Sequence, residues 1–424
     1  MTNRRDFIKK TAAVSAATIL SPSIAFASKA NSAIRVGIIG CGGRGTRVIS
    51  SMLQHTNTSV IAMADLFQDK LQHSKKSLDE INAEKGFSKI QNSSTYIGPE
   101  AYLRLLENKD VDAVLISSPA YTHPEFLEAA VAADKHVYCE KPVAPDVEGC
   151  KRVESVGNRI QGKLSIAVGF QIRHASPYVE MVNRIHQGDI GEIISVELHY
   201  LSSGVPIKDR DGISFDEARI RNQYHFRSLS GGILLDQGIH MLDVCNWALK
   251  SHPKNAIGIG GKKGTPDFGD TWNNFQIVYQ YENNINVSLH STQVGSKFGD
   301  VCARFIGSKG IAEAHYSGGV FINGENLWDS GVLKCATQEL TKEQRSAGVF
   351  SSSLHDADAN KEIHFIKSIE TGDYLNEASS GVESTLSAIM GRDAATSNKP
   401  LSWDETYFSN SKLDPKLNLI QFDK

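Results

Sequence analysis

An apolar run followed at once by a glycine-rich turn constrains the fold of this chain more than any other feature. The β-branched residues of 34–39 indicate a buried strand, and apolar residues at helical spacing follow the turn. In such a strand–turn–helix unit, glycines allow a tight turn, a close approach of the backbone to a pyrophosphate, and close helix–strand packing. Free N–H groups at the helix start hold the phosphates. The turn therefore predicts a dinucleotide site built from Gly40, Gly42, Gly43, Arg44 and Gly45.

An acidic residue ends the next expected strand. The run 59–65 is apolar up to its last residue, Asp65, which follows Gly45 by twenty positions. A dinucleotide fold places there the carboxylate that hydrogen-bonds a ribose 2′-hydroxyl. The carboxylate favours NAD over NADP because it repels a 2′-phosphate, although Arg44 offers that phosphate a partner. The alternative interpretation is a loop aspartate that caps a helix beginning at Gln68.

The first residues predict an export signal. Arg4-Arg5-Asp-Phe7-Ile-Lys9 matches a twin-arginine signal, and an apolar stretch and small residues up to Ala27 follow it. A disordered basic tail is the alternative. The apolar stretch is too short and too interrupted to span a membrane. We expect residues 1–27 to form the signal peptide, the export machinery to be a partner, and the mature protein to be periplasmic.

Composition sets bounds on the remaining functions. The chain has 424 residues, enough for two domains, and a formal net charge of −3, which gives no electrostatic case for nucleic acid. Its six cysteines are scattered without metal-ligand spacing, so we expect no metal site, and nothing in their spacing demands a disulfide.

The order of the predicted elements indicates the fold class. Strands and helices alternate over residues 33–145, which predicts an α/β Rossmann domain with a doubly wound parallel sheet. Successive strand patterns over 146–355 predict an α+β domain with a large open, mainly antiparallel sheet. We expect residues 356–424 to form C-terminal helices and a tail that pack back on the first domain. Ligands of the parallel sheet should bind at the carboxyl ends of its strands.

Two short polar clusters lie where chemistry is expected. Glu140-Lys141-Pro142 ends a strand of the first domain, and the proline restricts Lys141 to an extended conformation that points it into the cleft. Its ammonium can then orient or polarise a substrate hydroxyl. A solvated lysine is the alternative.

The second cluster begins a helix in the other domain. Asp236 and His240 are four residues apart, so they can lie on one side of the helix start. The carboxylate could then orient the imidazole, which could accept a proton from an alcohol. An N-capping aspartate and a core histidine are the alternative.

Taken together, these motifs resemble the Gfo/Idh/MocA family of NAD(P)-dependent sugar and polyol oxidoreductases. The resemblance covers nearly all of residues 33–406 and includes Ser117-Ser-Pro-Ala-Tyr-Thr-His123 beside the motifs above. It implies that Lys141, Asp236 and His240 are the catalytic trio, with His240 transferring the proton. It also implies cofactor contacts from Ser117, Pro119, His123, Glu140 and Lys141.

Five further polar residues are candidates for substrate binding. Arg173 and His174 follow a strand where the family contacts substrate, and Tyr224, His225 and Arg227 shortly precede Asp236 and mix aromatic groups with hydrogen-bond donors. A surface loop or a subunit contact is the alternative for each.

The expected reaction is oxidation or reduction of a secondary hydroxyl of a sugar, glycoside or cyclitol. Export implies that NAD is loaded beforehand and stays tightly bound, because a periplasm has no free NAD pool. The alternative is the NAD-dependent glycoside hydrolysis of a related exported branch, which works by transient C3 oxidation and elimination; Lys141 favours the dehydrogenase because that branch does not retain the matching lysine. A nucleotide-binding sugar sensor is the third hypothesis. The resemblance also implies a homo-oligomer, because the exposed faces of the large open sheets in this family commonly pair.

Overall fold

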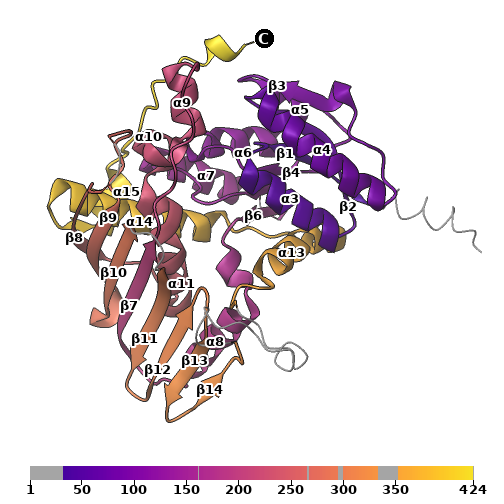
Figure 1. The fold of residues 1–424 in the computed structure, drawn as a ribbon. Coiled ribbons are helices and arrows are strands. Elements are labelled where there is room, and N and C mark those ends of the chain that lie inside the picture. The colour runs from indigo at the N-terminus through magenta and orange to yellow at the C-terminus, as the bar shows by residue number, and fades with distance from the viewer. Residues whose placement is uncertain (1–31, 161, 265–266, 295–298, 333–351, 424) are drawn as a thin grey trace, which may run out of the picture.

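The computed structural model describes residues 32–160, 162–264, 267–294, 299–332 and 352–423 (Figure 1). The predicted signal peptide and Cys335 lie outside these residues. The other five cysteines are buried and free. None of the described helices is long and apolar enough to cross a membrane.

The first domain is built on a six-stranded parallel sheet with the order β3-β2-β1-β4-β5-β6. Its strands are short and almost wholly apolar because helices cover both faces. This confirms the predicted doubly wound Rossmann domain. The strands are β1 (Ile34–Ile39), β2 (Thr58–Asp65), β3 (Thr95–Ile97), β4 (Ala113–Ile116), β5 (His136–Cys139) and β6 (Ile166–Val168), and the helices between them are α3 (Gly43–His55), α4 (Gln68–Glu84), α5 (Ala101–Leu106), α6 (His123–Ala132) and α7 (Val147–Ile160).

The predicted domain boundary at residues 145 and 146 lies one strand too early. β6 pairs in parallel with β5, with Val137 opposite Ile166 and Cys139 opposite Val168. The segment from β5 through α7 to β6 is therefore one more strand–helix–strand unit of the first sheet. The connection of this strand back to the parallel sheet depends on a pairing that is remote in sequence.

The second domain carries a nine-stranded sheet with the order β14-β13-β12-β11-β7-β10-β9-β8-β15. β10 runs parallel to β7, and the other neighbouring pairs are antiparallel. The large, mainly antiparallel sheet is thus confirmed. Its strands are β7 (Ile193–Ser202), β8 (Asn255–Gly261), β9 (Asn274–Gln280), β10 (Asn286–Gln293), β11 (Asp300–Gly307), β12 (Gly310–His315), β13 (Val320–Gly324), β14 (Trp328–Asp329) and β15 (Leu401–Ser402).

One face of this sheet is covered and the other is open. Burial alternates along β9 and β10, as expected for a sheet with one packed face. Helices α11 (Ile239–Leu249) and α14 (Ala378–Ser397) pack on the covered face. The open face exposes apolar side chains that include Ile257, Ile259 and Val278.

The C-terminal helices return to the first domain. Phe365 and Ile366 of α13 (Ala357–Thr371) are buried in one core with Val48 and Met52 of α3, and α14 packs against α7. The remaining elements are the helices α8 (Ser176–Gln187), α9 (Phe215–Arg221), α10 (Arg227–Ser230) and α15 (Trp403–Phe408), the 3₁₀ turns η1 (Asn92–Ser94), η2 (Ala120–Thr122), η3 (Gln171–His174), η4 (Gln223–His225), η6 (Glu282–Asn284) and η7 (Ile420–Phe422), and the π-helical turn η5 (Leu234–Gly238).

Candidate active site

A cleft of about 630 Å³ lies at the carboxyl ends of β1, β2, β4 and β5. Residues of the second domain complete its wall, including those at the start of α11. Most of the residues that the sequence assigned to cofactor and catalysis line this one cavity: Gly40, Gly42, Gly43, Arg44, Asp65, Ser117, Pro119, His123, Glu140, Lys141, Asp236 and His240. The structure therefore brings together motifs that are up to two hundred residues apart.

The glycine-rich turn leaves room where phosphates would lie. Gly40 has a φ of +95°, and a Cβ there would meet the backbone of Ser117 at 2.6 Å. A Cβ on Gly45 would lie 2.3 Å from the Gly40 carbonyl oxygen, so this glycine lets α3 approach β1. Around Gly42 and Gly43 no atom from another part of the described chain lies within 4 Å of such a Cβ. Gly42 is also the N-cap of α3 and brings no capping side chain. This open helix start fits a pyrophosphate.

The carboxylate of Asp65 stabilises the glycine-rich turn through hydrogen bonds to backbone N–H groups. One of its carboxylate oxygens accepts a hydrogen bond from the Cys41 N–H at 2.6 Å, and the other accepts one from the Phe67 N–H at 2.8 Å. Burial raises the pKa of this carboxyl group. Because each oxygen keeps a second lone pair, the group can still accept a ribose hydroxyl, which stays a prediction. The bond to Phe67, which precedes α4, also agrees in part with the alternative capping role.

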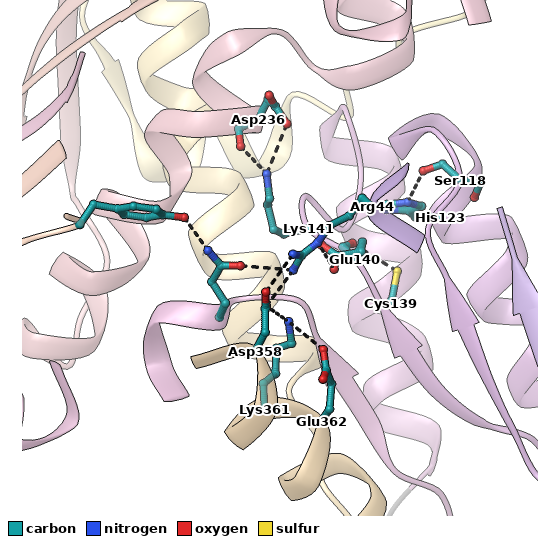
Figure 2. A network of polar contacts seen from close by, with 12 residues as sticks. Arg44, Ser118, His123, Cys139, Glu140, Lys141, Asp236, Asp358, Lys361 and Glu362 are labelled. Atoms are coloured by element: carbon teal, nitrogen blue, oxygen red, sulfur yellow. Dashed lines mark hydrogen bonds and ion pairs between the residues drawn. The ribbon is translucent and has the colours of Figure 1, made fainter. Parts of the chain in front are cut away.

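Arg44 turns toward carboxylates of its own chain (Figure 2). Its Nε lies 2.9 Å from Glu140 Oε1, and its terminal nitrogens lie 3.4 Å from the carboxylate of Asp358. Gln171 Oε1 accepts a further hydrogen bond of 3.3 Å. The guanidinium charge is therefore already balanced. This corrects the suggestion that Arg44 is available to a 2′-phosphate.

His123 holds two cofactor loops together. Its Nδ1 lies 2.8 Å from the Pro142 carbonyl oxygen, and its Nε2 lies 2.9 Å from that of Ser118. Burial lowers the pKa of this imidazole. The imidazole therefore ties the loops that follow β4 and β5 to each other, and its role in cofactor binding stays a prediction.

Lys141 reaches across the cleft to the second domain. Its Nζ donates to the backbone carbonyl of Asp236 and lies 3.3 Å from that residue's Oδ1 (Figure 2). Both side chains are mostly buried, with 14% and 19% of their surfaces exposed. The Lys141–Pro142 peptide bond is cis. The lysine is thus a positioned cleft residue rather than a solvated one.

Asp236 does not orient His240, although the sequence suggested that it would. It lies in the π-helical turn η5, in which one turn spans more residues than in an α-helix, so a step of four residues does not return to the same side. Its carboxylate faces Lys141 instead. Nor is it an N-cap, because Gly238 occupies that position of α11.

His240 lies at the wall of the cleft among aromatic rings. Tyr200, Tyr316 and Phe170 surround its imidazole at 6.2–6.3 Å between ring centres. No described residue hydrogen-bonds either ring nitrogen, and Nδ1 is fully buried without a partner. Burial, followed by the charge of Lys141, holds the pKa of His240 well below its usual value. The imidazole is therefore neutral at neutral pH and can accept a proton.

Of the five predicted substrate residues, Tyr224 alone lines the cleft. Asp236, followed by burial, raises the pKa of its hydroxyl. Arg173 instead makes a bidentate ion pair with buried Asp243, with the shortest contact at 2.8 Å. Arg227 pairs with Asp393 at 2.8 Å.

The two remaining predicted substrate residues also lie elsewhere. His225 packs beside Phe268, with 6.2 Å between ring centres. His174 lies beside His364 of α13, with 5.5 Å between ring centres. These positions correct the expectation for Arg173, His174, His225 and Arg227. Their side chains follow elements near the cleft but turn into domain contacts.

The polar residues of the cleft wall that sequence reasoning missed include Gln171 and Tyr316. Gln171 donates a hydrogen bond to the Tyr316 hydroxyl, and both line the cavity. Burial raises the pKa of Tyr316 to about 12, so its hydroxyl stays protonated. Gln171 lies two residues before Arg173 and could have been included with it, whereas Tyr316 follows β12 without a local signal.

Two sequence comparisons define the class of protein. Residues 34–167 match the description "Oxidoreductase family, NAD-binding Rossmann fold", and residues 178–313 match the C-terminal domain of the same family. Together they cover more than half of the chain, with both domains in their usual order. The chain belongs to the Gfo/Idh/MocA family of NAD-binding oxidoreductases. The glycine cradle described above agrees with that cofactor.

Particular relatives and structures narrow the comparison. The chain is 26% identical to inositol 2-dehydrogenase 2 of Saccharopolyspora erythraea over 66% of this chain and 73% of the relative. It is 25% identical to myo-inositol 2-dehydrogenase of Thermotoga maritima over 60% and 72% of the two chains. The fold resembles scyllo-inositol dehydrogenase from Lactobacillus casei with bound NAD(H) and scyllo-inositol, with a TM-score of 0.64, 21% identity, and coverage of 88% of this chain and 99% of the other. It also resembles aldose-aldose oxidoreductase from Caulobacter crescentus, with a TM-score of 0.66, 19% identity, and coverage of 87% and 99%.

Proposed function

We propose that the protein oxidises or reduces a secondary hydroxyl of a cyclitol or sugar with bound NAD. The observation that carries this proposal is the neutral, unpartnered imidazole of His240 in the same cleft as Lys141 and the glycine cradle. The relatives that match over most of their length are inositol dehydrogenases, which supports a cyclitol or sugar as the substrate.

Each polar group has a separate task in this reaction. Bound NAD⁺ supplies the acceptor for the hydride that leaves the carbinol carbon. His240 accepts the hydroxyl proton as the carbonyl forms, and it returns that proton in the reverse direction. Lys141, held by Asp236, donates a hydrogen bond to the same oxygen and stabilises its developing negative charge. Tyr224, Gln171 and Tyr316 supply further hydrogen bonds to substrate hydroxyls.

The proposal is tested with purified mature protein, NAD⁺ and a panel of inositols, aldoses and aryl glycosides. Nicotinamide reduction and aglycone release are followed in the same samples. We expect at least one cyclitol or free sugar to give one NADH for each molecule oxidised. We expect no release of aglycone. Aglycone release without net reduction contradicts the proposal and indicates the redox-neutral glycoside hydrolase. Binding of sugar without either signal contradicts it in favour of a sensor.

We further propose that NAD is held tightly and leaves slowly. Arg221 of α9 makes two hydrogen bonds to Asp69, at 2.8 and 2.9 Å, and its guanidinium lies 4.1 Å from the ring centre of Phe67. Phe422 of the C-terminal tail contacts the same ring edge-on, with 5.6 Å between centres. Arg221, Phe67 and Leu419 all line the cleft. We call this closure of Arg221, Asp69, Phe67 and Phe422 the clasp.

Tight retention of NAD agrees with export of the folded protein by the twin-arginine route. We propose this route from the first residues of the sequence. The prediction is that protein purified from the periplasm carries close to one NAD per chain after extensive dialysis, measured after denaturation. Replacement of Arg4-Arg5 by two lysines should keep the protein in the cytoplasm. Export of that variant at the normal rate, or a nucleotide-free purified protein, contradicts this part of the proposal.

The open face of the nine-stranded sheet supports a homo-oligomer. Its exposed isoleucine and valine side chains form an apolar surface on one side of the molecule, as surfaces buried between subunits do. We propose that two copies pair through this face. Light scattering on the wild type and on an Ile259→Lys variant tests this, with a change to the monomer mass expected for the variant.

A further inference from the structure

Three potential metal ligands meet behind the active site, on the side of η3 that does not line the cleft. His174 ends η3, His364 lies on α13, and Glu377 is the N-cap of α14. One ligand atom from each lies within 4.8 Å of the others. Because the three are separated by up to about two hundred residues, their sequence spacing gave no sign of a metal site.

Most of the potential ligand atoms of this cluster have no hydrogen-bond partner among the described residues. No described residue hydrogen-bonds the imidazole nitrogens of His174 or His364. Glu377 Oε2 accepts the Val168 N–H at 2.8 Å, which fixes the carboxylate and leaves its other oxygen without a partner. The backbone N–H of Glu377 donates to the Ile166 carbonyl oxygen at 2.9 Å, so the residue is tied to β6. Two imidazoles and one carboxylate are thus available and partly preorganised.

The charges around the cluster permit a cation. A metal ion binds the neutral form of an imidazole, so binding at His174 and His364 would displace any proton on the coordinating nitrogen. The two nearest cations are balanced by partners of their own. Arg173 is paired with Asp243 at 2.8 Å, and Lys361 with Asp358 at 2.8 Å. The carboxylate of Glu377 is the one acidic group of the cluster and would supply its negative charge once a metal ion is bound.

A second group of potential ligands lacks this availability. Cys302, Glu313 and His315 also approach one another on the nine-stranded sheet. Glu313, however, already bonds Arg304 at 2.5 Å and His315 at 2.6 Å. A metal ion there would have to displace an existing ion pair.

We propose that His174, His364 and Glu377 bind a divalent transition metal ion, with Zn²⁺ as the best match to two imidazoles and a carboxylate. Tetrahedral Zn²⁺ brings such ligand atoms to about 3.3 Å from one another. Rotation of the exposed His364 side chain closes the remaining gap, and a water molecule takes the fourth position. The ion would fasten η3 to α13 and α14. Since η3 carries Gln171 and α13 carries Asp358, it would steady two of the three partners of Arg44.

The test measures metal binding directly on tag-free mature protein. Zn²⁺ is titrated by calorimetry, and Co²⁺ is titrated in parallel because its visible spectrum reports a tetrahedral nitrogen and oxygen environment. We expect one equivalent of either ion, a rise in Tm with Zn²⁺, and an intense Co²⁺ band. His364→Ala should abolish all three signals and keep the metal-free Tm, because the side chain is exposed and has no hydrogen bond. Glu377→Gln should weaken binding by at least tenfold.

A matched variant separates the two clusters. Cys302→Ser disables the group on the nine-stranded sheet and should leave the stoichiometry and the spectrum unchanged. Loss of binding in Cys302→Ser with full binding in His364→Ala assigns the ion to the sheet and overturns the proposal. Absence of saturable binding in the wild type also overturns it. Neither result depends on turnover, so the outcome is independent of the proposed reaction.

Discussion

At the scale of single residues, the environment of His240 determines which chemistry the cleft can perform. The imidazole is surrounded by aromatic rings and faces the positive charge of Lys141, and both lower its pKa. A neutral imidazole is the form that removes a proton from an alcohol. The nearby carboxylate of Asp236 is engaged by Lys141 and does not offset this effect.

Replacing His240 should therefore impair turnover and leave cofactor binding intact. We expect His240→Ala to lower kcat by about 10²- to 10⁴-fold, the usual contribution of a general base. Steady-state kinetics measure this, and nucleotide titration should give an unchanged Kd for NAD. His290→Ala, an exposed histidine on the nine-stranded sheet, is the control and should behave as the wild type. An equal loss of kcat in His240→Ala and His290→Ala would contradict the assignment of His240 as the general base.

The lowered pKa of His240 also predicts the pH dependence of oxidation. A base is active when deprotonated, so activity falls only as the pH drops through its pKa. Because burial and Lys141 place that pKa well below 6.5, kcat/KM should show no loss from His240 between pH 7.5 and 6.5. The measurement is a pH profile of kcat/KM in the wild type. An acid limb centred at or above pH 6.5 contradicts a buried neutral base.

At the scale of elements, two glycines at the junction of β1 and α3 have different roles. Gly42 has φ −73° and ψ −179°, a conformation that any residue adopts, and its missing side chain leaves open space in the cleft. Gly45 is packed against the Gly40 carbonyl oxygen. The absence of a side chain at Gly42 therefore leaves room for a ligand, whereas at Gly45 it allows α3 to pack closely against β1.

This difference predicts opposite results for two alanine variants. Gly42→Ala should keep the wild-type Tm and weaken NAD binding by about tenfold, since a methyl group enters the phosphate cradle. Gly45→Ala should lower the free energy of unfolding by about 1–3 kcal/mol, because a Cβ 2.3 Å from a backbone oxygen forces α3 away from β1. Thermal denaturation and nucleotide titration of both variants provide the comparison. A stable Gly45→Ala protein would show that α3 moves freely.

Local patterns predicted these elements well because their information is local. The strand of 34–39, the glycine turn and Asp65 lie within about thirty residues, and the lysine of Glu140-Lys141-Pro142 reaches the cleft as expected. The contacts that were missed join distant segments. Arg44 bonds Asp358, 314 residues away, and Gln171, 127 residues away. The π-helical turn likewise redirected Asp236, and no sequence period signalled it.

At the scale of the whole molecule, two domains and the C-terminal tail share one cleft. The first domain supplies Phe67 and Asp69, the second supplies Arg221, and the tail supplies Leu419 and Phe422. In the proposed arrangement, release of NAD requires at least part of the clasp to open. The stability of the clasp should therefore affect the dissociation rate of NAD more than the rate of the chemical step.

Weakening the clasp should accelerate NAD release in proportion to the contact removed. The Arg221–Asp69 pair is partly exposed, so Arg221→Gln should raise the dissociation rate by about two- to fivefold. Phe422 is 9% exposed, and Phe422→Ala, which removes a buried aromatic contact, should raise it by more than tenfold. Lys412→Gln is the matched control, because it breaks an exposed pair with Glu148 in the same tail, and neither residue lines the cleft. Displacement of bound NAD by an excess of a fluorescent analogue, followed by stopped flow, measures each rate. Equal rates in all three variants would show that the tail does not control release, whereas the expected order identifies the clasp as the element that retains the cofactor.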